Sequence, residues 1–443
     1  MFPFSIAKIC ELTGGVFFGD AALLSIHPEE LTIDTRKLSA GDLYVCIRGE
    51  SFDGHAFAAE AAAKGALCVL ADCEVGAPYI RVADTVAAFQ AIAHAYRKLF
   101  SLPVIAVTGS AGKTSTKEML CAVLSQRYNT LKSLGNLNNQ TGAPQVLLTL
   151  QTAHKAAIVE MGMNHFGEID ALARMTEPDF AVITNIGDAH IGNLGSREGI
   201  FRAKTELLAH LRTGGRVVVC GDDAFLRTIP NAVLYGMEPH NDVRAENVQA
   251  LGLQGTKFDA LFGGRRLHVH VPVPGMHMVI NALCGVALGW LLSLDDAEIA
   301  AGIYSYIAPA GRMEILRGAR FTILNDAYNA SPASMRASID VLAQSNGRKV
   351  FVMGDMLELG EDAPRYHAEV GAYAREKGID LLLCVGELSR AANGDAWYPS
   401  IATLCADLPA QLRHGDAVLI KASHGSRLDG VAAFILKEYC PSA

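Results

Sequence analysis

Short, unbroken apolar runs alternate with helix-like stretches through most of this 443-residue chain. Between residues 103 and 221 the runs are VIAVTG, AAIVEMG, FAVITNIG and RVVVCG, and helical stretches separate them. Strands that are apolar on both faces and separated by helices are typical of a parallel sheet covered on both sides. The pattern therefore predicts an α/β fold with a parallel sheet at its centre.

Two interruptions divide this pattern into three units. Pro103 disfavours helix in the residue before it, which places a boundary near residue 100. The residues before it hold two strand-like runs and two Ala-rich helical stretches. A helix that begins near Gly275 is expected to close the second unit close to Pro309, and Gly311-Arg312 opens a third series of strands. We expect three α/β domains, 1–100, 101–310 and 311–443, because such a length exceeds one ordinary core.

Composition excludes several classes of protein. Charged residues make up 19% of the chain and the formal net charge is −8, which does not favour nucleic acid or an anionic membrane as a partner. We find no apolar stretch as long as a membrane span and no secretory signal. The ten cysteines include no CxxC pair, so they are interpreted as reduced thiols of a cytoplasmic protein rather than as zinc ligands.

The strongest local signal is a glycine loop between a strand and a helix, in VIAVTGSAGKTSTKEML. Its residues are Gly109, Ser110, Ala111, Gly112, Lys113 and Thr114. Glycines let backbone N–H groups surround an anion, and the helix N-terminus adds a partial positive charge. Lys113 can reach terminal phosphates and the Thr114 hydroxyl can hold Mg²⁺. The loop is shorter than the full Walker pattern, since Val107 stands where that pattern has glycine; a plain glycine turn is the alternative.

Polar residues follow the other predicted strands of the central unit, where parallel sheets bind ligands. Glu160 ends AAIVE, and near Thr114 it would complete a Mg²⁺ site; a carboxylate that caps a helix is the alternative. His190 taken alone favours a structural role. Asp222 and Asp223 have the pattern of turn and cap residues.

Two further segments of the central unit carry polar residues. Lys204 lies in an amphipathic helix candidate, REGIFRAKTELLAHL, where a lysine is usually solvated. Asn138 and Asn139 lie in the loop GNLNNQTG, which can wrap a phosphate or a carboxylate but is more often only turns.

Taken in order, these segments resemble the Mur ligases of peptidoglycan synthesis over essentially the whole chain. The matching segments are TGSAGKT, GNLNNQTGAP, VEMGMNHFGEI, TNIGDAHIGNLGS, REGIFRAKTEL, GMHMVINAL, GRME and DAYNASP. NDAYNASPASM and VMGDMLELGE resemble the branch that adds D-alanyl-D-alanine, and the DNPR-like segment of the diaminopimelate-adding branch is not found. Ser331 stands where the family commonly has Asn, and Ala422 and His424 stand where KGSR is common.

The resemblance implies that each domain binds a different ligand. The first would bind a UDP-sugar, the central P-loop domain would bind ATP, and a Rossmann-like third domain would close on ATP and bind the incoming dipeptide. It implies ATP-dependent ligation of D-alanyl-D-alanine to UDP-N-acetylmuramoyl-tripeptide through an acyl phosphate, giving the pentapeptide precursor of peptidoglycan. The protein is expected to be a cytoplasmic monomer with ATP and Mg²⁺ as cofactors.

The resemblance also assigns residues. Lys113, His190 and Lys204 would be catalytic; Thr114 and Glu160 would hold one Mg²⁺, and His190 and a carbamate on Lys204 would serve a second. Asn281, Arg312 and Asp326 would contact ATP together with the phosphate loop. The substrate residues would be Thr35, Arg36, Arg48, Gly49, Asp53, Gly54 and His55 for the UDP-sugar, with Asn138, Asn139, Tyr328 and Asn329 elsewhere.

Three rival functions stay open on the sequence. A folylpolyglutamate-type ligase shares the phosphate loop, although the UDP-sugar-like unit before residue 100 speaks against it. A non-catalytic nucleotide- or UDP-sugar-binding regulator would bind without turnover. A mechanical P-loop NTPase lacks support from separate Walker B-like or nucleic-acid-binding features.

Overall fold

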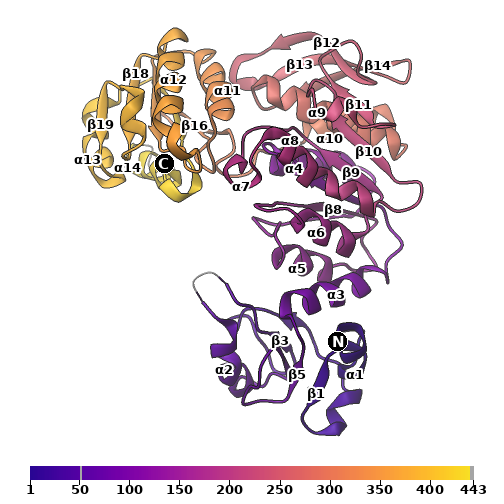
Figure 1. The fold of residues 1–443 in the computed structure, drawn as a ribbon. Helices are drawn as coiled ribbons and strands as arrows, with labels where there is room; N and C mark the ends of the chain where they lie inside the picture. Colours follow the sequence, from indigo (N-terminus) through magenta and orange to yellow (C-terminus); the bar gives the residue numbers. More distant parts are fainter. Residues whose placement is uncertain (50–51, 440–443) are drawn as a thin grey trace. The chain divides into compact units, whose positions relative to one another are not determined.

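The computed structural model describes residues 1–49 and 52–439, and it contains three sheets of five, nine and six strands (Figure 1). Glu50 and Ser51, in the segment that resembles a UDP-sugar site, lie outside the described residues. Each sheet has helices packed against it, so the expected three-domain α/β architecture is confirmed.

The first sheet has the order β1-β5-β4-β3-β2, in which β2 to β5 are parallel and β1 is an antiparallel edge strand. Helices α1 and α3 cover one face through Ile6, Ile9, Phe89 and Ile92, and α2 covers the other. The elements are α1 (Ile6–Thr13), β1 (Val16–Phe18), β2 (Leu31–Thr32), β3 (Leu43–Val45), α2 (Ala58–Ala63), β4 (Cys68–Ala71), β5 (Tyr79–Arg81) and α3 (Thr85–Arg97), with 3-10 turns η1 (Ala21–Ser25) and η2 (Gly54–Phe57).

The second sheet has the order β14-β13-β12-β11-β10-β9-β6-β8-β7. Its strands are β6 (Val104–Thr108), β7 (Thr130–Lys132), β8 (Ala156–Glu160), β9 (Phe180–Ile183), β10 (Arg216–Cys220), β11 (Val233–Gly236), β12 (Val243–Ala250), β13 (Thr256–Phe262) and β14 (Arg265–Val271). The four predicted apolar strands are confirmed as β6, β8, β9 and β10. Strands β13 and β14 extend the sheet beyond β12 by antiparallel pairing, an extension that the sequence did not predict. These strands are buried on one face only, so they carry no continuous apolar run that would have revealed them.

The helices of this second region begin with α4 (Lys113–Leu124), α5 (Gly142–Leu148), α6 (Glu168–Thr176), α7 (Ile191–Leu194) and α8 (Arg197–Thr205), with η3 (Glu206–His210), η4 (Leu226–Thr228) and η5 (Gly252–Gln254) between strands. The single helix expected from Gly275 to Pro309 is two helices, α9 (Met276–Leu291) and α10 (Asp296–Tyr304). Asp295 and Glu298 form a capping box that starts α10 afresh, which is why the helical pattern breaks there.

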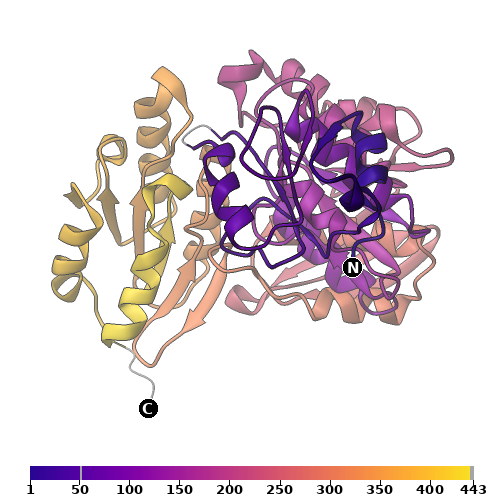
Figure 2. The same ribbon diagram turned by 90° about the horizontal axis from the view of Figure 1, so that it is seen from below.

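The third sheet has the order β15-β16-β20-β17-β18-β19, parallel except for the edge strand β15. Helices α13 and α14 pack on one face and α11 and α12 on the other (Figure 2). The bounds are β15 (Glu314–Arg317), β16 (Thr322–Asn325), α11 (Pro332–Ala343), β17 (Lys349–Gly354), η6 (Gly360–Asp362), α12 (Ala363–Glu376), β18 (Leu381–Val385), η7 (Ser389–Ala392), β19 (Ala396–Tyr398), α13 (Ile401–Gln411), β20 (Ala417–Lys421), η8 (His424–Ser426) and α14 (Asp429–Tyr439).

Packing divides the chain into two compact units. The first comprises Met1–Ala106, Asn129–Ala181 and Thr205–Gly215, and the second comprises Val107–Tyr128, Val182–Lys204 and Arg216–Ala443. The phosphate loop, α9 and the third sheet all belong to the second unit. Contacts among these three parts therefore lie within one compact unit.

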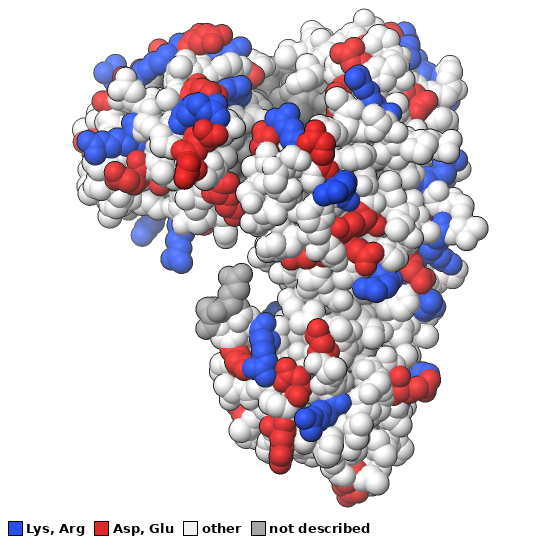
Figure 3. All heavy atoms as spheres, viewed as in Figure 1, with Lys and Arg blue, Asp and Glu red and all other residues white. Residues whose placement is uncertain are grey.

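Acidic and basic side chains are interspersed over the face drawn in Figure 3, so neither sign covers it. No helix among residues 1–49 and 52–439 is long and apolar enough to cross a membrane.

Candidate active site

The glycine loop has the predicted local structure. Strand β6 ends at Thr108 and α4 begins at Lys113, with Gly109 at φ 149° and Gly112 at φ 79° between them. Both angles lie in the region that favours glycine, which lets the chain turn sharply into the helix. The Lys113 ammonium donates to the Gly109 carbonyl over 2.8 Å, and the Thr114 side chain is buried. The loop thus places a lysine and a threonine hydroxyl at one helix N-terminus.

Residues after β9 hold the loop in this shape. The Ala111 carbonyl accepts from the Thr184 hydroxyl at 2.6 Å and from the Asn185 amide at 3.0 Å. In return, the Asn185 side-chain oxygen accepts from the Ala111 N–H at 2.9 Å, and its carbonyl accepts from the Ser110 N–H at 3.0 Å. Asn185 therefore braces the loop at Ser110 and Ala111 through its side chain and its backbone carbonyl.

The predicted nucleotide helix α9 lies against the helix that follows the loop. The Thr116 hydroxyl of α4 donates to the side-chain oxygen of Asn281 over 3.1 Å, and both residues are buried. A candidate base-binding residue therefore lies beside the candidate phosphate-binding loop. Burial lowers the pKa of the neighbouring His277, which favours its neutral form.

Lys204 is not solvated, contrary to the expectation from its amphipathic helix. The residue is 1% exposed, and burial together with nearby Lys113 lowers its pKa well below the usual range. An amphipathic pattern identifies the buried face of a helix but does not reveal a lysine that is turned into it. Burial thus disfavours the charged form of Lys204 relative to an exposed lysine.

The other polar residues after β9 and β10 differ in role. His190 has φ 67°, precedes α7, and lies with its Nδ1 3.9 Å from a carboxylate oxygen of Glu358. The Asp223 carboxylate accepts from the amides of Phe225 and Leu226, as expected of a cap residue. Its neighbour Asp222 accepts from amides after β11, which confirms a structural role for both aspartates.

Glu160 is buried at the end of β8, and two neighbours hold it. Its amide donates to the Ser133 hydroxyl at 3.0 Å, and Asn138 donates to its carboxylate at 2.9 Å. Asn139 instead accepts from the amides of Thr141 and Gly142 at the start of α5. Of the two asparagines, Asn138 faces a candidate metal ligand, and Asn139 is engaged in a turn.

The first sheet presents four ionisable residues in the segments that follow β3 and β4. The Arg48 guanidinium bridges Asp53 and Asp72, with Arg48–Asp72 hydrogen bonds of 2.8 and 3.1 Å. The His55 ring approaches Asp53 at 2.6 Å through Nδ1 and Asp72 at 3.1 Å through Nε2. Hydrogen bonds from Arg48 lower the pKa of Asp72, and those from His55 lower that of Asp53. Asp72 was missed in the sequence, since only its place after β4 marks it.

Other predicted UDP-sugar residues lie in the loops after β2 and β3 of the same sheet. Arg36 pairs with Asp34 at 2.8 Å in the turn after β2, and the Thr35 carbonyl accepts from Lys64 at 2.8 Å. The Gly49 amide donates to the Phe52 carbonyl at 2.9 Å, and the Gly54 carbonyl accepts from the Tyr44 hydroxyl at 3.0 Å. The predicted set is therefore a group of loops after β2 and β3.

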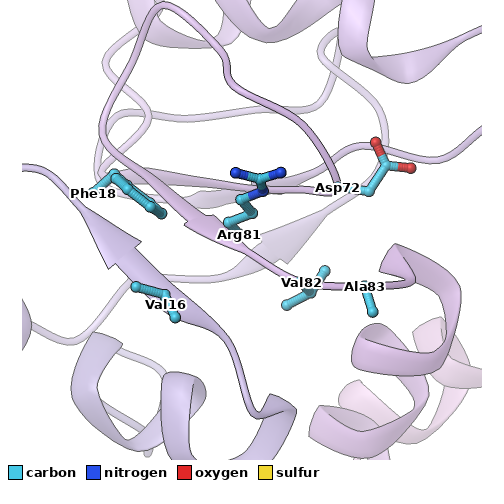
Figure 4. A pocket seen from close by; sticks show the side chains of 6 residues that line it. All are labelled: Val16, Phe18, Asp72, Arg81, Val82 and Ala83. Atoms are coloured by element: carbon cyan, nitrogen blue, oxygen red, sulfur yellow. The ribbon is translucent and has the colours of Figure 1, made fainter.

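Asp72 also borders a surface hollow of about 410 Å³ at the edge of the same sheet, lined by Val16, Phe18, Asp72, Arg81, Val82 and Ala83 (Figure 4). The close-up shows the Arg81 guanidinium between Phe18 and Asp72. This hollow contains none of the predicted substrate residues.

The third domain gathers its predicted residues at the carboxyl ends of β16 and β20. One carboxylate oxygen of Asp326 accepts from the buried Lys421 ammonium and from the Ser338 hydroxyl, both at 2.6 Å. Lys421 also donates to the Asn329 carbonyl at 2.9 Å. The Arg312 guanidinium lies 3.9 Å from the Tyr328 ring centre. The structure thus brings Arg312, Asp326, Tyr328 and Asn329 together, and adds Lys421, which ends an apolar strand.

Comparisons with known proteins match most of the chain. Family models match residues 27–107 (Mur ligase family, catalytic domain), 107–289 (Mur ligase middle domain) and 311–424 (Mur ligase, glutamate ligase domain). The UDP-N-acetylmuramoyl-tripeptide–D-alanyl-D-alanine ligase of Bacillus subtilis is 36% identical over 424 residues, covering 91% of this chain and 92% of that protein.

Solved structures agree with these sequence matches. A crystal structure of MurF from Acinetobacter baumannii has a TM-score of 0.92 at 32% identity, covering 98% of this chain and 99% of that one. MurF ligase from Thermotoga maritima in complex with ADP has a TM-score of 0.84 at 27% identity, covering 92% and 97%.

The fold and the braced loop define a three-domain α/β protein with a phosphate-binding P-loop in its central domain. The chain belongs to the Mur ligase family.

Proposed function

We propose that this protein joins D-alanyl-D-alanine to UDP-N-acetylmuramoyl-tripeptide at the expense of ATP, giving the UDP-linked pentapeptide precursor of peptidoglycan. The observation that carries the proposal is the braced loop Gly109–Thr114 with Asn281 beside it, in a chain whose full-length relatives bear this name. A binding-only regulator would not need a buried lysine near the loop lysine, which favours catalysis over that rival.

The reaction requires an activated carboxylate, because a free carboxylate does not react with an amine at useful rates. Transfer of the ATP γ-phosphoryl group to the terminal carboxylate of the tripeptide gives an acyl phosphate and ADP. The dipeptide amine then attacks the acyl carbon, and phosphate leaves from the tetrahedral intermediate. Lys113 and the amides of Gly109, Gly112 and Thr114 would neutralise the phosphates as charge builds up. The amides of Ser110 and Ala111 donate to Asn185 in this structure and would have to turn toward the phosphates to join them.

Mg²⁺ fits the residues proposed to hold it. The Thr114 hydroxyl and the Glu160 carboxylate are hard oxygen donors, the kind of ligand that Mg²⁺ takes in proteins. His190 and Lys204 would serve a second ion, with Lys204 as a carbamate; a neutral amine is the form that reacts with CO₂. When bound, Mg²⁺ would offset the negative charge of the phosphates.

The remaining assignments belong to the same proposal. Domain 1–100 would bind the UDP-sugar through the loops that carry Thr35, Arg36, Arg48, Gly49, Asp53, Gly54 and His55. Domain 101–310 would bind ATP, with Asn138 and Asn139 in a loop near the tripeptide. Domain 311–443 would close on ATP through Arg312 and Asp326 and present Tyr328 and Asn329 to the dipeptide. The protein would act as a monomer in the cytoplasm.

An ADP-release assay tests this proposal. We expect release only when D-alanyl-D-alanine and a UDP-tripeptide are both present, with lysine and diaminopimelate forms of the tripeptide tested in turn. Lys113→Ala should abolish it, and Lys98→Ala, at an exposed lysine, should not. Release driven by folate and glutamate instead would favour the rival ligase, and nucleotide binding without release would favour the regulator.

A further inference from the structure

Two adjoining loops of the third domain carry charged residues in a strained backbone conformation. Glu358 follows β17 with φ 65°, and Arg427 follows β20 with φ 53°. Residues other than glycine rarely adopt positive φ angles, and residues held in such conformations cluster at ligand sites. Both residues are exposed, so burial does not explain the strain.

Hydrogen bonds tie the two loops together. The Ser423 amide donates to the Asp355 carbonyl at 2.9 Å, and the Ser423 hydroxyl accepts from the Leu357 amide at 2.9 Å. Ser426 adds a hydroxyl bond of 3.4 Å to the same Asp355 carbonyl. Leu357 and Ser426 immediately precede Glu358 and Arg427, so the positions of these two residues are set by one connected unit at the carboxyl edge of the sheet.

Opposite charges on this unit do not neutralise each other. Arg427 forms no side-chain hydrogen bond or ion pair with any residue in the described ranges 1–49 and 52–439. Glu358 is 76% exposed at its side chain and approaches only the His190 ring, at 3.9 Å. A separated acid and base present complementary charge to a ligand that carries both signs.

We propose that Glu358 and Arg427 bind the zwitterionic dipeptide, with Arg427 on its terminal carboxylate and Glu358 on its amino group. The inference rests on the proposed ligation and names residues for its second substrate. A dipeptide separates its charged ends by up to about 7 Å, so a pair that is not in mutual contact suits it better than a closed ion pair. Arginine binds a carboxylate through two parallel hydrogen bonds. Glu358 takes the amine because it is the one that approaches His190, a candidate residue of the reacting centre.

Paired substrates test the assignment of Arg427. We would measure kcat/KM for D-alanyl-D-alanine and for D-alanyl-D-alaninamide, which lacks the carboxylate, with the full-length protein, ATP and UDP-tripeptide. R427Q should lower kcat/KM for the dipeptide about 10- to 100-fold and leave the value for the amide unchanged. R427K should recover part of the loss, and R413Q, at another exposed arginine of the domain, should change neither value.

Glu358 has a different signature, because both substrates carry the amino group. E358Q should raise KM for both substrates alike, and E376Q, at an exposed glutamate of α12, should change neither. Equal losses with both substrates in R427Q, or no loss at all, would overturn the assignment of Arg427. If R427Q unfolds, R427G gives the same readout, since glycine adopts φ 53° readily. Absence of turnover in the unmodified protein would instead refute the ligation itself, and with it this inference.

Discussion

Alanine substitutions at the two glycines of the phosphate loop distinguish the effect of a steric clash from that of backbone strain. A Cβ atom at Gly109 would lie 1.9 Å from the Thr184 hydroxyl oxygen and 3.1 Å from the Thr184 amide nitrogen. A Cβ atom at Gly112 would meet nothing closer than 3.9 Å, at the side-chain oxygen of Asn281. Alanine at 112 therefore suffers only the unfavourable φ, whereas alanine at 109 also displaces a residue that braces the loop.

The expected costs follow from these contacts. Gly112→Ala should lower the free energy of unfolding by about 1–2 kcal/mol, the usual penalty for a left-handed backbone with a side chain. Gly109→Ala should cost about 2–4 kcal/mol, because its strain is joined by loss of the 2.6 Å bond from Thr184 to Ala111. If restoring the nucleotide-binding conformation of the loop costs about 3 kcal/mol, the variant would bind nucleotide on the order of 100-fold more weakly.

Urea unfolding and calorimetric titration with Mg-ADP measure both quantities. In the double variant Gly109→Ala/Thr184→Ala, the nearest atom is gone and the losses should be less than additive. Equal effects of the two single glycine variants on binding and stability would refute the reasoning, as would Gly109→Ala binding ADP like the unmodified protein.

Three further substitutions probe the other parts of the candidate site. Asp72→Asn should raise KM for the UDP-tripeptide more than it lowers kcat. Because Arg48 lowers the pKa of Asp72 in the folded protein, the variant should be less stable than the unmodified protein above pH 3.8, and this difference in stability should vanish as pH falls through the folded-state pKa. Unfolding measured along an acid titration checks this. Asn281→Ala should weaken ADP binding and cost about 1 kcal/mol through the lost bond to Thr116, seen by calorimetry and urea unfolding. Asp326→Ala leaves the buried lysine at the end of β20 uncompensated and should cost about 3 kcal/mol in urea, whereas a cost below 1 kcal/mol would show that this pair is not needed.

Much of the fold could be predicted from the apolar runs, because a strand that is buried on both faces needs apolar residues along its whole length. The runs that end at Thr108, Glu160 and Lys421 all became strands, and their ends carry polar residues. The antiparallel β12–β14 extension escaped notice because RRLHVHV alternates between solvent and core. The edge strands β15 and β19 are short and only partly buried, so they also lack a strong signal.

Less of the candidate site than of the fold could be predicted from the sequence. The glycine loop could be predicted because its spacing and its strand–helix context are local. The burial of Lys204 could not, because helical periodicity does not specify which lysine faces the interior. The roles of Asn185 and Asp72 depend on partners 74 and 24 residues away, respectively, and no local pattern encodes such contacts.

The central claim is that this protein forms an amide through a phosphorylated carboxylate. Its most direct test uses UDP-tripeptide labelled with ¹⁸O in the terminal carboxylate, with ATP and D-alanyl-D-alanine, followed by mass analysis of the phosphate released. We predict that one ¹⁸O atom appears in each phosphate, because the bridging oxygen of an acyl phosphate leaves with phosphorus. Pentapeptide formed together with unlabelled phosphate would contradict the account.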